Sequence, residues 1–475
     1  MKHDYLSHTQ ADGDVTDIYS GEKKDYFGQD WSKAPKTRFW RGRHLSRRAF
    51  FRSASAAVGG YFLLPSALSE RALAAAPTLN TAKNCIFILL AGAPSHVDTF
   101  DLKVGAWTPA YFNPTRYDGV LFPQGLMPKI AEQMDSIAMV RSVRAWATAH
   151  DVAQSWSQLV RNPANALSKL APHIGSVVSY ELGDKTQILP PFFSMNVGTG
   201  LGQGYLPPYN APTYITPGGG GLAGSTHPDG EAVFNRRYTL ALDLDSDLRA
   251  NAPYGDTTDE MVTFNEAARK LMYNPQVSSI FTFDATQRNA YGNTAFGNAC
   301  ITARNLLRAK MGTRFVQITL GGWDNHINIY QANANLQSAT RTLDNGLGPL
   351  MADLKQDGLL NDTLIVVMGE FGRTVGALNV QAGRDHHPQQ TVMMAGGGIR
   401  GKRAIGITDD NGNAVVEPGW SLNREIRAED IGATIYSALG IDWTQIKRDY
   451  PLGRGFEYIP GASTGDYAPI RELWG

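Results

Sequence analysis

Short, continuously apolar runs alternate along this chain with segments whose apolar residues recur at helical spacing. Continuous apolar runs indicate strands of a sheet that is covered on both faces, and here they span residues 85–91, 136–140, 315–320, 363–368 and 392–395. Helical spacing is found in residues 150–161, 331–357 and 428–442. Strands that alternate with helices predict an α/β fold, a three-layer sandwich around a mostly parallel central sheet.

The residues before the first run have the layout of an export signal. The string SRRAFFR is followed by a short apolar run rich in Ala and Gly and then by small residues at 74–76, where we expect cleavage. The pair Arg47-Arg48 resembles a twin-arginine signal, and the apolar run is too short to remain as a transmembrane anchor. We therefore predict a disordered polar leader (1–45), a signal peptide (46–76), the twin-arginine translocase as export partner, and a periplasmic or extracellular location.

Residues 77–475 then form a single predicted α/β domain. Within it, residues 196–230 are rich in Gly and Pro and show little periodicity, which predicts a long loop insertion that is either a functional lid or a surface excursion. The formal net charge is zero and charged residues make up 19% of the chain, so a basic footprint for nucleic acid is absent. The two cysteines are too few for a disulfide framework.

Polar residues gather beside every predicted strand. In chain order these residues are Ser95, His96, Asp98 and Asp101, then Thr148, His150 and Asp151, then Asp324 and His326, then Glu370 and Arg373, and finally GRDHHP at 383–388, just before the fifth strand. Ligand sites of open α/β sheets lie at the carboxyl ends of the strands. We therefore expect these clusters to converge on one edge of the sheet.

Carboxylates that are brought together repel one another unless a cation is present. Mixed histidine and carboxylate ligands favour divalent zinc, with manganese, iron or calcium as alternatives. Two such ions would account for about six ligands and would clamp an anionic substrate. Arg373 or Arg384 could hold a phosphate or sulfate oxygen, and Asp385 could fix an imidazole from behind.

The strings LAGAPSHVDTFD, GGWDNH, VVMGEFGRT, GRDHHP and EDIGATIYSALGID, in this order, resemble the alkaline-phosphatase-like superfamily. More closely, they resemble its twin-arginine-exported branch, the domain of unknown function 1501 family, which is often labelled sulfatase-like. The resemblance covers residues 84–442. It implies metal ligation by five residues, with His386 favoured over His387 as the last of them: Asp98, Asp324, His326, Glu370 and His386.

The resemblance leaves the nucleophile open. Superfamily enzymes use Ser, Thr or formylglycine, but the C/S-x-P-x-R string of formylglycine sulfatases is absent from the sequence. Thr148 and His150 are the predicted residues at the reacting centre, Ser95 is a further hydroxyl, and Arg373 would orient the anion. The prediction is an exported metal-dependent hydrolase of phosphate or sulfate esters, acting on an anionic small-molecule or glycan ester. The alternative is a non-catalytic, metal-stabilised binding protein of the envelope.

Overall fold

The computed structural model describes residues 77–165, 170–197, 200–251, 257–448 and 455–475. All of them belong to one structural unit, Ala75–Gly475. The predicted leader (1–45) and signal peptide (46–76) lie outside the described residues. In the described part of the chain, no helix is both long enough and apolar enough to cross a membrane.

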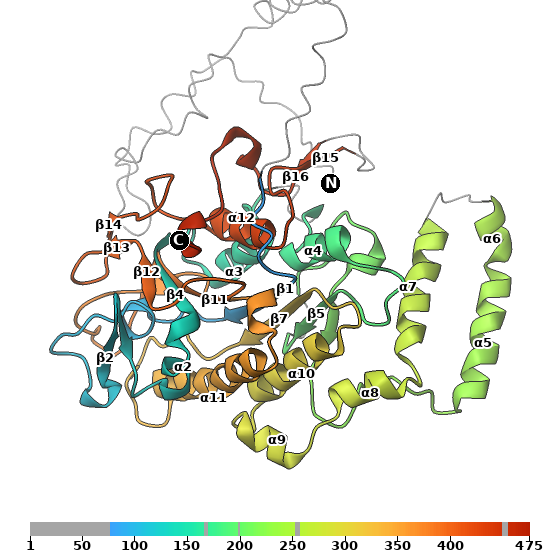
Figure 1. Ribbon diagram of the computed structural model, residues 1–475, viewed down its shortest axis with the longest axis horizontal. Coiled ribbons are helices and arrows are strands. Elements are labelled where there is room, and N and C mark those ends of the chain that lie inside the picture. The colour runs from blue at the N-terminus through green and yellow to red at the C-terminus, as the bar shows by residue number, and fades with distance from the viewer. Residues whose placement is uncertain (1–76, 166–169, 198–199, 252–256, 449–454) are drawn as a thin grey trace, which may run out of the picture. The chain divides into compact units, whose positions relative to one another are not determined.

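An eight-stranded sheet forms the centre of this unit (Figure 1). In spatial order its strands are β12 (Arg403–Ile405), β4 (Ile137–Arg144), β11 (Gln389–Gly396), β8 (Thr363–Met368), β1 (Asn84–Leu90), β7 (Phe315–Leu320), β5 (Phe192–Met195) and β6 (Thr213–Ile215). Strand β11 is antiparallel to both of its neighbours, β4 and β8, and every other pairing in the sheet is parallel. The predicted α/β fold with a mostly parallel sheet is confirmed.

Helices pack around the sheet, and the described residues also form short two-stranded antiparallel ribbons. The α-helices are α2 (Pro128–Ala131), α3 (His150–Leu159), α4 (Ile174–Leu182), α5 (Glu231–Leu244), α6 (Ser246–Asn251), α7 (Thr257–Leu271), α8 (Pro275–Phe281), α9 (Ala285–Ala290), α10 (Ala295–Ala309), α11 (Asn335–Gln356) and α12 (Ala428–Ala438). The ribbons are β2 (Pro114–Tyr117) with β3 (Val120–Pro123), β9 (Gly372–Arg373) with β10 (His386–His387), β13 (Ile407–Thr408) with β14 (Val415–Glu417), and β15 (Ile446–Lys447) with β16 (Phe456–Glu457).

Alternate residues of β1 enter two separate hydrophobic cores. Ile86, Ile88 and Leu90 pack in the core that contains the buried faces of α10 and α11. Cys85, Phe87 and Leu89 pack in the core that contains those of α4 and α12. Figure 1 shows these helix pairs on opposite faces of the sheet. A strand covered on both faces needs apolar residues at every position, which is why the strands are continuous apolar runs in the sequence.

The observed elements differ from the predicted ones mainly at their ends. Strand β4 continues to Arg144 and β11 begins at Gln389, because polar residues extend both strands and pair with each other beyond their apolar centres. The segment 196–230, predicted as a long loop, contributes the edge strand β6, which pairs parallel with β5. Its Thr-Tyr-Ile sequence suits a strand, although the surrounding Gly and Pro residues obscure it.

Candidate metal centre

The reversed direction of β11 decides where the site lies. The loops that follow β1, β4, β7 and β8 meet at one edge of the sheet, and the residues that precede β11 reach the same edge because this strand runs the opposite way. The β9–β10 ribbon joins two of the predicted motifs there, since His386 pairs directly with Arg373. Sequence segments that are far apart are thus brought together as expected from the motif positions.

Four polar side chains converge at this edge: His150, Asp324, His326 and His386, with one potential ligand atom of each lying within 4.8 Å of all the others. His326 Nε2 is 3.0 Å from His386 Nε2 and 2.9 Å from Asp324 Oδ1. His150 Nε2 is 3.3 Å from the same Asp324 oxygen. Three imidazole Nε2 atoms and one carboxylate oxygen therefore face a common point.

The other ring nitrogen of each histidine has its own acceptor. His150 Nδ1 lies 2.6 Å from Glu370 Oε1. His326 Nδ1 lies 3.1 Å from Asp385 Oδ1, and His386 Nδ1 lies 2.7 Å from the carbonyl oxygen of Thr148. An acceptor at Nδ1 favours the tautomer with its proton there, which leaves the Nε2 lone pair available to a metal ion.

This tautomer pattern makes the cluster suitable for a cation. With both protons on Nδ1, the Nε2 lone pairs of His326 and His386 oppose each other at 3.0 Å. His150 Nε2 is buried and has no hydrogen-bond partner among the described residues. Buried polar atoms without partners are uncommon, and an ion that accepts the three Nε2 lone pairs would give His150 Nε2 a partner. Histidine nitrogens with one carboxylate are a ligand set typical of zinc, and also of manganese or iron.

Nearby groups lower the pKa values of two cluster residues, His386 and Asp324. Partial burial, the guanidinium of Arg373 and the other two histidines lower the pKa of His386, so its imidazole is neutral at pH 7. Burial alone would raise the pKa of Asp324, but the hydrogen bond and charge of Arg373 outweigh this effect and lower it. Neutral imidazoles beside an ionised carboxylate are the forms that bind metal ions.

Arg373 is buried and its N–H groups point at protein acceptors. Nε donates to the carbonyl oxygen of Ala93 at 2.8 Å, and Nη2 donates to Asp324 Oδ1 at 2.6 Å and to the carbonyl oxygen of Gly92. Nη1 donates to the carbonyl oxygen of Arg384 at 3.2 Å and to His326 Nε2 at 3.1 Å. These bonds use all five N–H groups of a guanidinium. Of these five bonds, a metal ion would displace only the one to His326 Nε2. Arg373 therefore fixes Asp324, and its guanidinium has no two free N–H groups for the anion that it was expected to orient.

Asp98, a predicted metal ligand, lies outside the four-residue cluster. Its side chain is 1% exposed, and both of its oxygens are occupied. Oδ2 accepts from Arg384 Nε at 2.7 Å and from Ser95 Oγ at 2.6 Å. Oδ1 accepts from Tyr330 Oη at 2.7 Å and from Arg384 Nη2 at 3.2 Å. The structure thus uses Asp98 in a buried ion pair, since four donors leave no lone pair directed at an ion.

Glu370, also a predicted ligand, is placed behind the cluster. Its Oε1 accepts from the backbone N–H of Gly92 and the amide of Gln154, both at 2.9 Å, besides contacting His150. Gln154 was missed in the sequence, although its position one helical turn after His150 places it on the same face of α3. Glu370 therefore holds the orientation of His150 and is not among the four converging residues.

The two predicted hydroxyls differ in their surroundings. Thr148 is half-buried and lies just before α3. Its carbonyl oxygen contacts His386 Nδ1. Ser95 is 2% exposed and donates to Asp98, so it belongs to the buried network. Of these two residues, Thr148 is thus the one whose backbone contacts the cluster.

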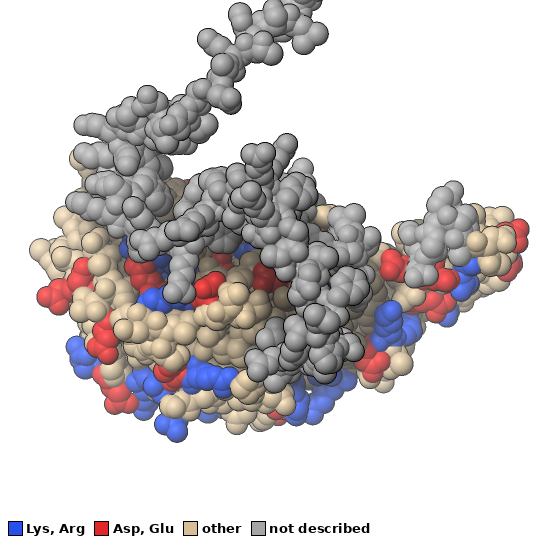
Figure 2. Space-filling view, turned by 90° about the horizontal axis from the view of Figure 1, so that it is seen from above, with Lys and Arg blue, Asp and Glu red and all other residues tan. Residues whose placement is uncertain are grey.

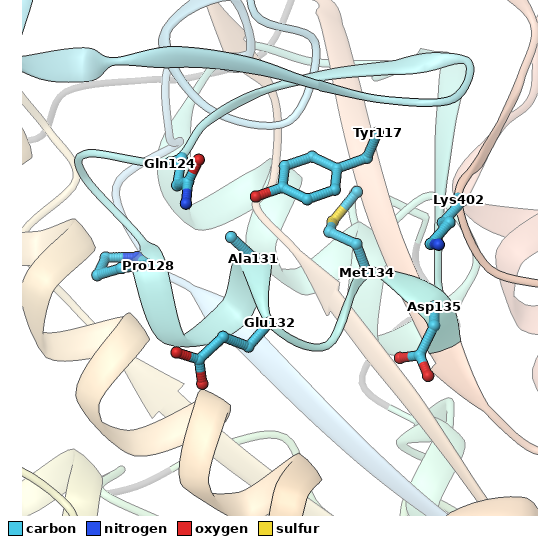
Figure 3. Close-up of a pocket in the computed structure, with 8 residues that line it drawn as sticks. All are labelled: Tyr117, Gln124, Pro128, Ala131, Glu132, Met134, Asp135 and Lys402. Atoms are coloured by element: carbon cyan, nitrogen blue, oxygen red, sulfur yellow. The ribbon is translucent and has the colours of Figure 1, made fainter.

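A pocket of about 370 Å³ lies elsewhere in the unit (Figure 3). Its lining residues are Tyr117, Gln124, Pro128, Ala131, Glu132, Met134, Asp135 and Lys402. Asp135 and Lys402 come just before β4 and β12, so the pocket lies at the edge where these strands begin. The four-residue cluster is at the opposite edge, and this pocket is separate from it.

Comparisons with known proteins place these observations in context. A family described as "Protein of unknown function (DUF1501)" matches residues 82–458, and no curated protein matches the sequence. The fold is similar to that of the PsFucS1 sulfatase from Pseudoalteromonas sp. (13% identity, 76% of this chain and 68% of that chain, TM-score 0.39). It is also similar to the phosphonate monoester hydrolase SpPMH from Silicibacter pomeroyi (12%, 83% and 77%, 0.38) and to a protein in the alkaline phosphatase superfamily from Vibrio parahaemolyticus (13%, 76% and 67%, 0.35).

Proposed function

The chain belongs to the DUF1501 family of proteins of unknown function, as its motifs predicted, and from its metal centre we propose that it is a metal-dependent hydrolase of phosphate or sulfate esters. One observation carries this proposal. Three imidazoles and a carboxylate face one point, and each imidazole is held from behind by its own acceptor. Such support from behind is typical of metal sites. The substrate class is an anionic small-molecule or glycan ester.

In this proposal the four cluster residues hold a divalent ion, zinc first, with manganese, iron or calcium as alternatives. When bound, the ion supplies a Lewis acid for the ester's phosphoryl or sulfuryl oxygen. Glu370, Asp385 and the Thr148 carbonyl group orient the imidazoles. Arg373 holds Asp324 in its ionised form. Thr148, two residues before His150, supplies a hydroxyl for the reacting centre in this proposal.

A second function is favoured by the placement of Arg373 and Ser95. Arg373 donates to protein groups and Ser95 is buried, so neither side chain is presented to a substrate. The alternative is therefore a non-catalytic binding protein of the envelope that the metal ion stabilises. In that case, removal of the ion would lower the melting temperature, and no ester would be turned over.

A matched pair of adjacent histidines tests the proposal. Protein purified without chelator is assayed for metal by mass spectrometry and for turnover on a panel of phosphate and sulfate esters. His386→Ala is expected to lose metal and at least about 100-fold of the activity, because ligand loss exceeds the 10–100-fold effect of an outer partner. His387→Ala is the control, since His387 Nε2 contacts Asn413 instead. Metal-free wild-type protein would refute both functions, and metal without turnover would favour the second.

We also propose export through the twin-arginine pathway to the periplasm or beyond, with residues 46–76 as the signal and residues 77–475 as one mature domain. The proposal rests on the string SRRAFFR and the small residues at 74–76. Joint replacement of Arg47→Lys and Arg48→Lys is expected to retain the protein in the cytoplasm. Cell fractionation measures the outcome, and unchanged export of this variant would contradict it.

A further inference from the structure

Helices α5, α6 and α7 form an arm at the side of the sheet sandwich (Figure 1). Helix α5 is the outer helix, and none of its residues is buried. It is held to α7 by Tyr238, whose hydroxyl donates to Glu266 Oε1 at 3.1 Å and whose ring lies 5.4 Å from the guanidinium of Arg269. Tyr238 therefore marks the face of α5 that packs on α7, and the opposite face of this helix is uncovered.

The uncovered face of α5 carries large apolar side chains. Leu240 is 58% exposed and Leu244 is 72% exposed. Residues four apart lie on one face of a helix, so the two leucines form a stripe, and the exposed Leu248 follows it in α6. Helix α5 has 14 residues and is thus about 21 Å long. A solvent-facing leucine stripe of this kind marks an interaction surface.

Charged residues on the same face are arranged by sign along the helix. Arg236 lies one turn before Leu240 and Asp243 lies nearly one turn after it, and both are exposed. Positions 236, 240, 243 and 244 follow the spacing of a single helical stripe. The face therefore begins with a basic residue, Arg236, and its acidic residue, Asp243, lies between Leu240 and Leu244.

We propose that the outer face of α5 binds the same face of a second copy of this chain, with the two helices antiparallel. A two-fold contact requires a self-complementary surface. An antiparallel pair centred between residues 239 and 240 brings the two Leu240 side chains together and sets each Arg236 opposite the Asp243 of the other copy. A membrane surface suits the face less well, because helices that lie on membranes carry Lys and Arg along their polar side, whereas this face carries an aspartate between its leucines.

The contact is small, because one helix of each copy supplies it, and small interfaces are typical of weak, reversible association. We expect a weak, reversible monomer–dimer equilibrium. Sedimentation velocity of the purified full-length chain over a range of concentrations measures it. Leu240→Asp is expected to raise the dissociation constant at least about 10-fold, because it places two like charges at the centre of the contact. Val416→Asp, at a 67% exposed position of β14, is the control and should leave it unchanged.

Charge reversal tests the antiparallel register. Arg236→Glu and Asp243→Arg should each weaken the dimer several-fold, since each places like charges opposite one another. The double variant should restore it, because the swapped charges are again complementary. Circular dichroism and melting curves verify that every variant folds. A wild-type chain that stays monomeric at all concentrations, a dimer insensitive to Leu240→Asp, or a monomer that binds lipid vesicles through this stripe would overturn the proposal. Failure of the double variant would overturn the register.

Discussion

Two aspartates at the same edge of the sheet, Asp98 and Asp324, have opposite environments. Asp98 follows β1 and is 1% exposed, with both oxygens taken by Arg384, Tyr330 and Ser95. Asp324 follows β7 and its side chain is 50% exposed, with Oδ1 facing Arg373 and three imidazoles. The donors that tertiary structure brings to a carboxylate decide whether it serves as a structural partner or as a ligand.

The comparison also separates two kinds of histidine. His96 lies beside Asp98, is 2% exposed and has Nε2 bonded to the carbonyl oxygen of Gly412. The cluster histidines His150, His326 and His386 are partly exposed and present Nε2 to one another or to Asp324. The contrast is one of access and convergence: His96 is buried and its Nδ1 has no hydrogen-bond partner among the described residues, whereas the cluster side chains are partly exposed and present their ligand atoms to a common point.

The largest effect is expected from breaking the buried pair. Arg384→Leu leaves the Asp98 charge buried without its cation, which costs about 3–5 kcal/mol of unfolding free energy. Urea unfolding measures the loss, and metal content should not change in the folded fraction. Lys83→Ala is the control, because the Lys83–Asp362 pair is exposed and such pairs contribute at most about 1 kcal/mol. Loss of bound metal from folded Arg384→Leu protein would show that Asp98 belongs to the metal centre after all.

A smaller effect is expected from the support behind the cluster. Glu370→Gln keeps the shape of the side chain but removes the charge that holds His150 Nδ1, so metal affinity should fall about 10–100-fold. Competition with a chelating dye measures the affinity. Asp385→Asn should cost less, because Asp385 is 58% exposed and its contact with His326 is longer, at 3.1 Å. Equal effects of the two variants would mean that burial does not strengthen this support.

The smallest effect concerns pH and His96. Burial, despite the hydrogen bond to Gly412, lowers the pKa of His96 to about 4 from the ordinary 6.5. Between these values only the unfolded state binds the proton, so stability is complete above pH 6.5 and is lost as pH falls toward 4. From pH 7 to pH 5 the wild type should lose about 1–2 kcal/mol more than His96→Gln. Urea titrations at both pH values test this, and parallel losses in the two proteins would contradict it.

Much of the fold could be predicted, because its strands are buried on both faces and their sequences are continuously apolar. Strands β7 and β8 begin and end at the predicted residues. The C-terminal end of β4 and the N-terminal end of β11 could not be predicted from apolar runs, since paired polar residues extend these strands. Strand β6 was hidden among Gly and Pro residues, and its pairing with β5 depends on a neighbour that the local sequence does not specify.

The sequence predicted the edge of the sheet where the polar residues converge, but not all the residues that make up the cluster. Asp324, His326 and His386, expected as ligands, and His150, expected at the reacting centre, lie together. Asp98 and Glu370 were expected in the same role because the resemblance implied it, and motif order carries no information on which donors surround a carboxylate. The cation that pairs with Asp98 is Arg384, which is 286 positions away along the chain.

The sequence by itself determined the layered α/β architecture and the edge of the sheet where polar residues gather, because continuous apolar runs and the residues beside them are local properties. Only the tertiary structure decided which of those residues converge on one point and which pair with each other. That choice depends on the antiparallel course of β11, on the β9–β10 pairing of His386 with Arg373, and on distances of a few ångströms between distant segments. Electrostatic and hydrogen-bond partners act at that range, and sequence spacing does not encode it.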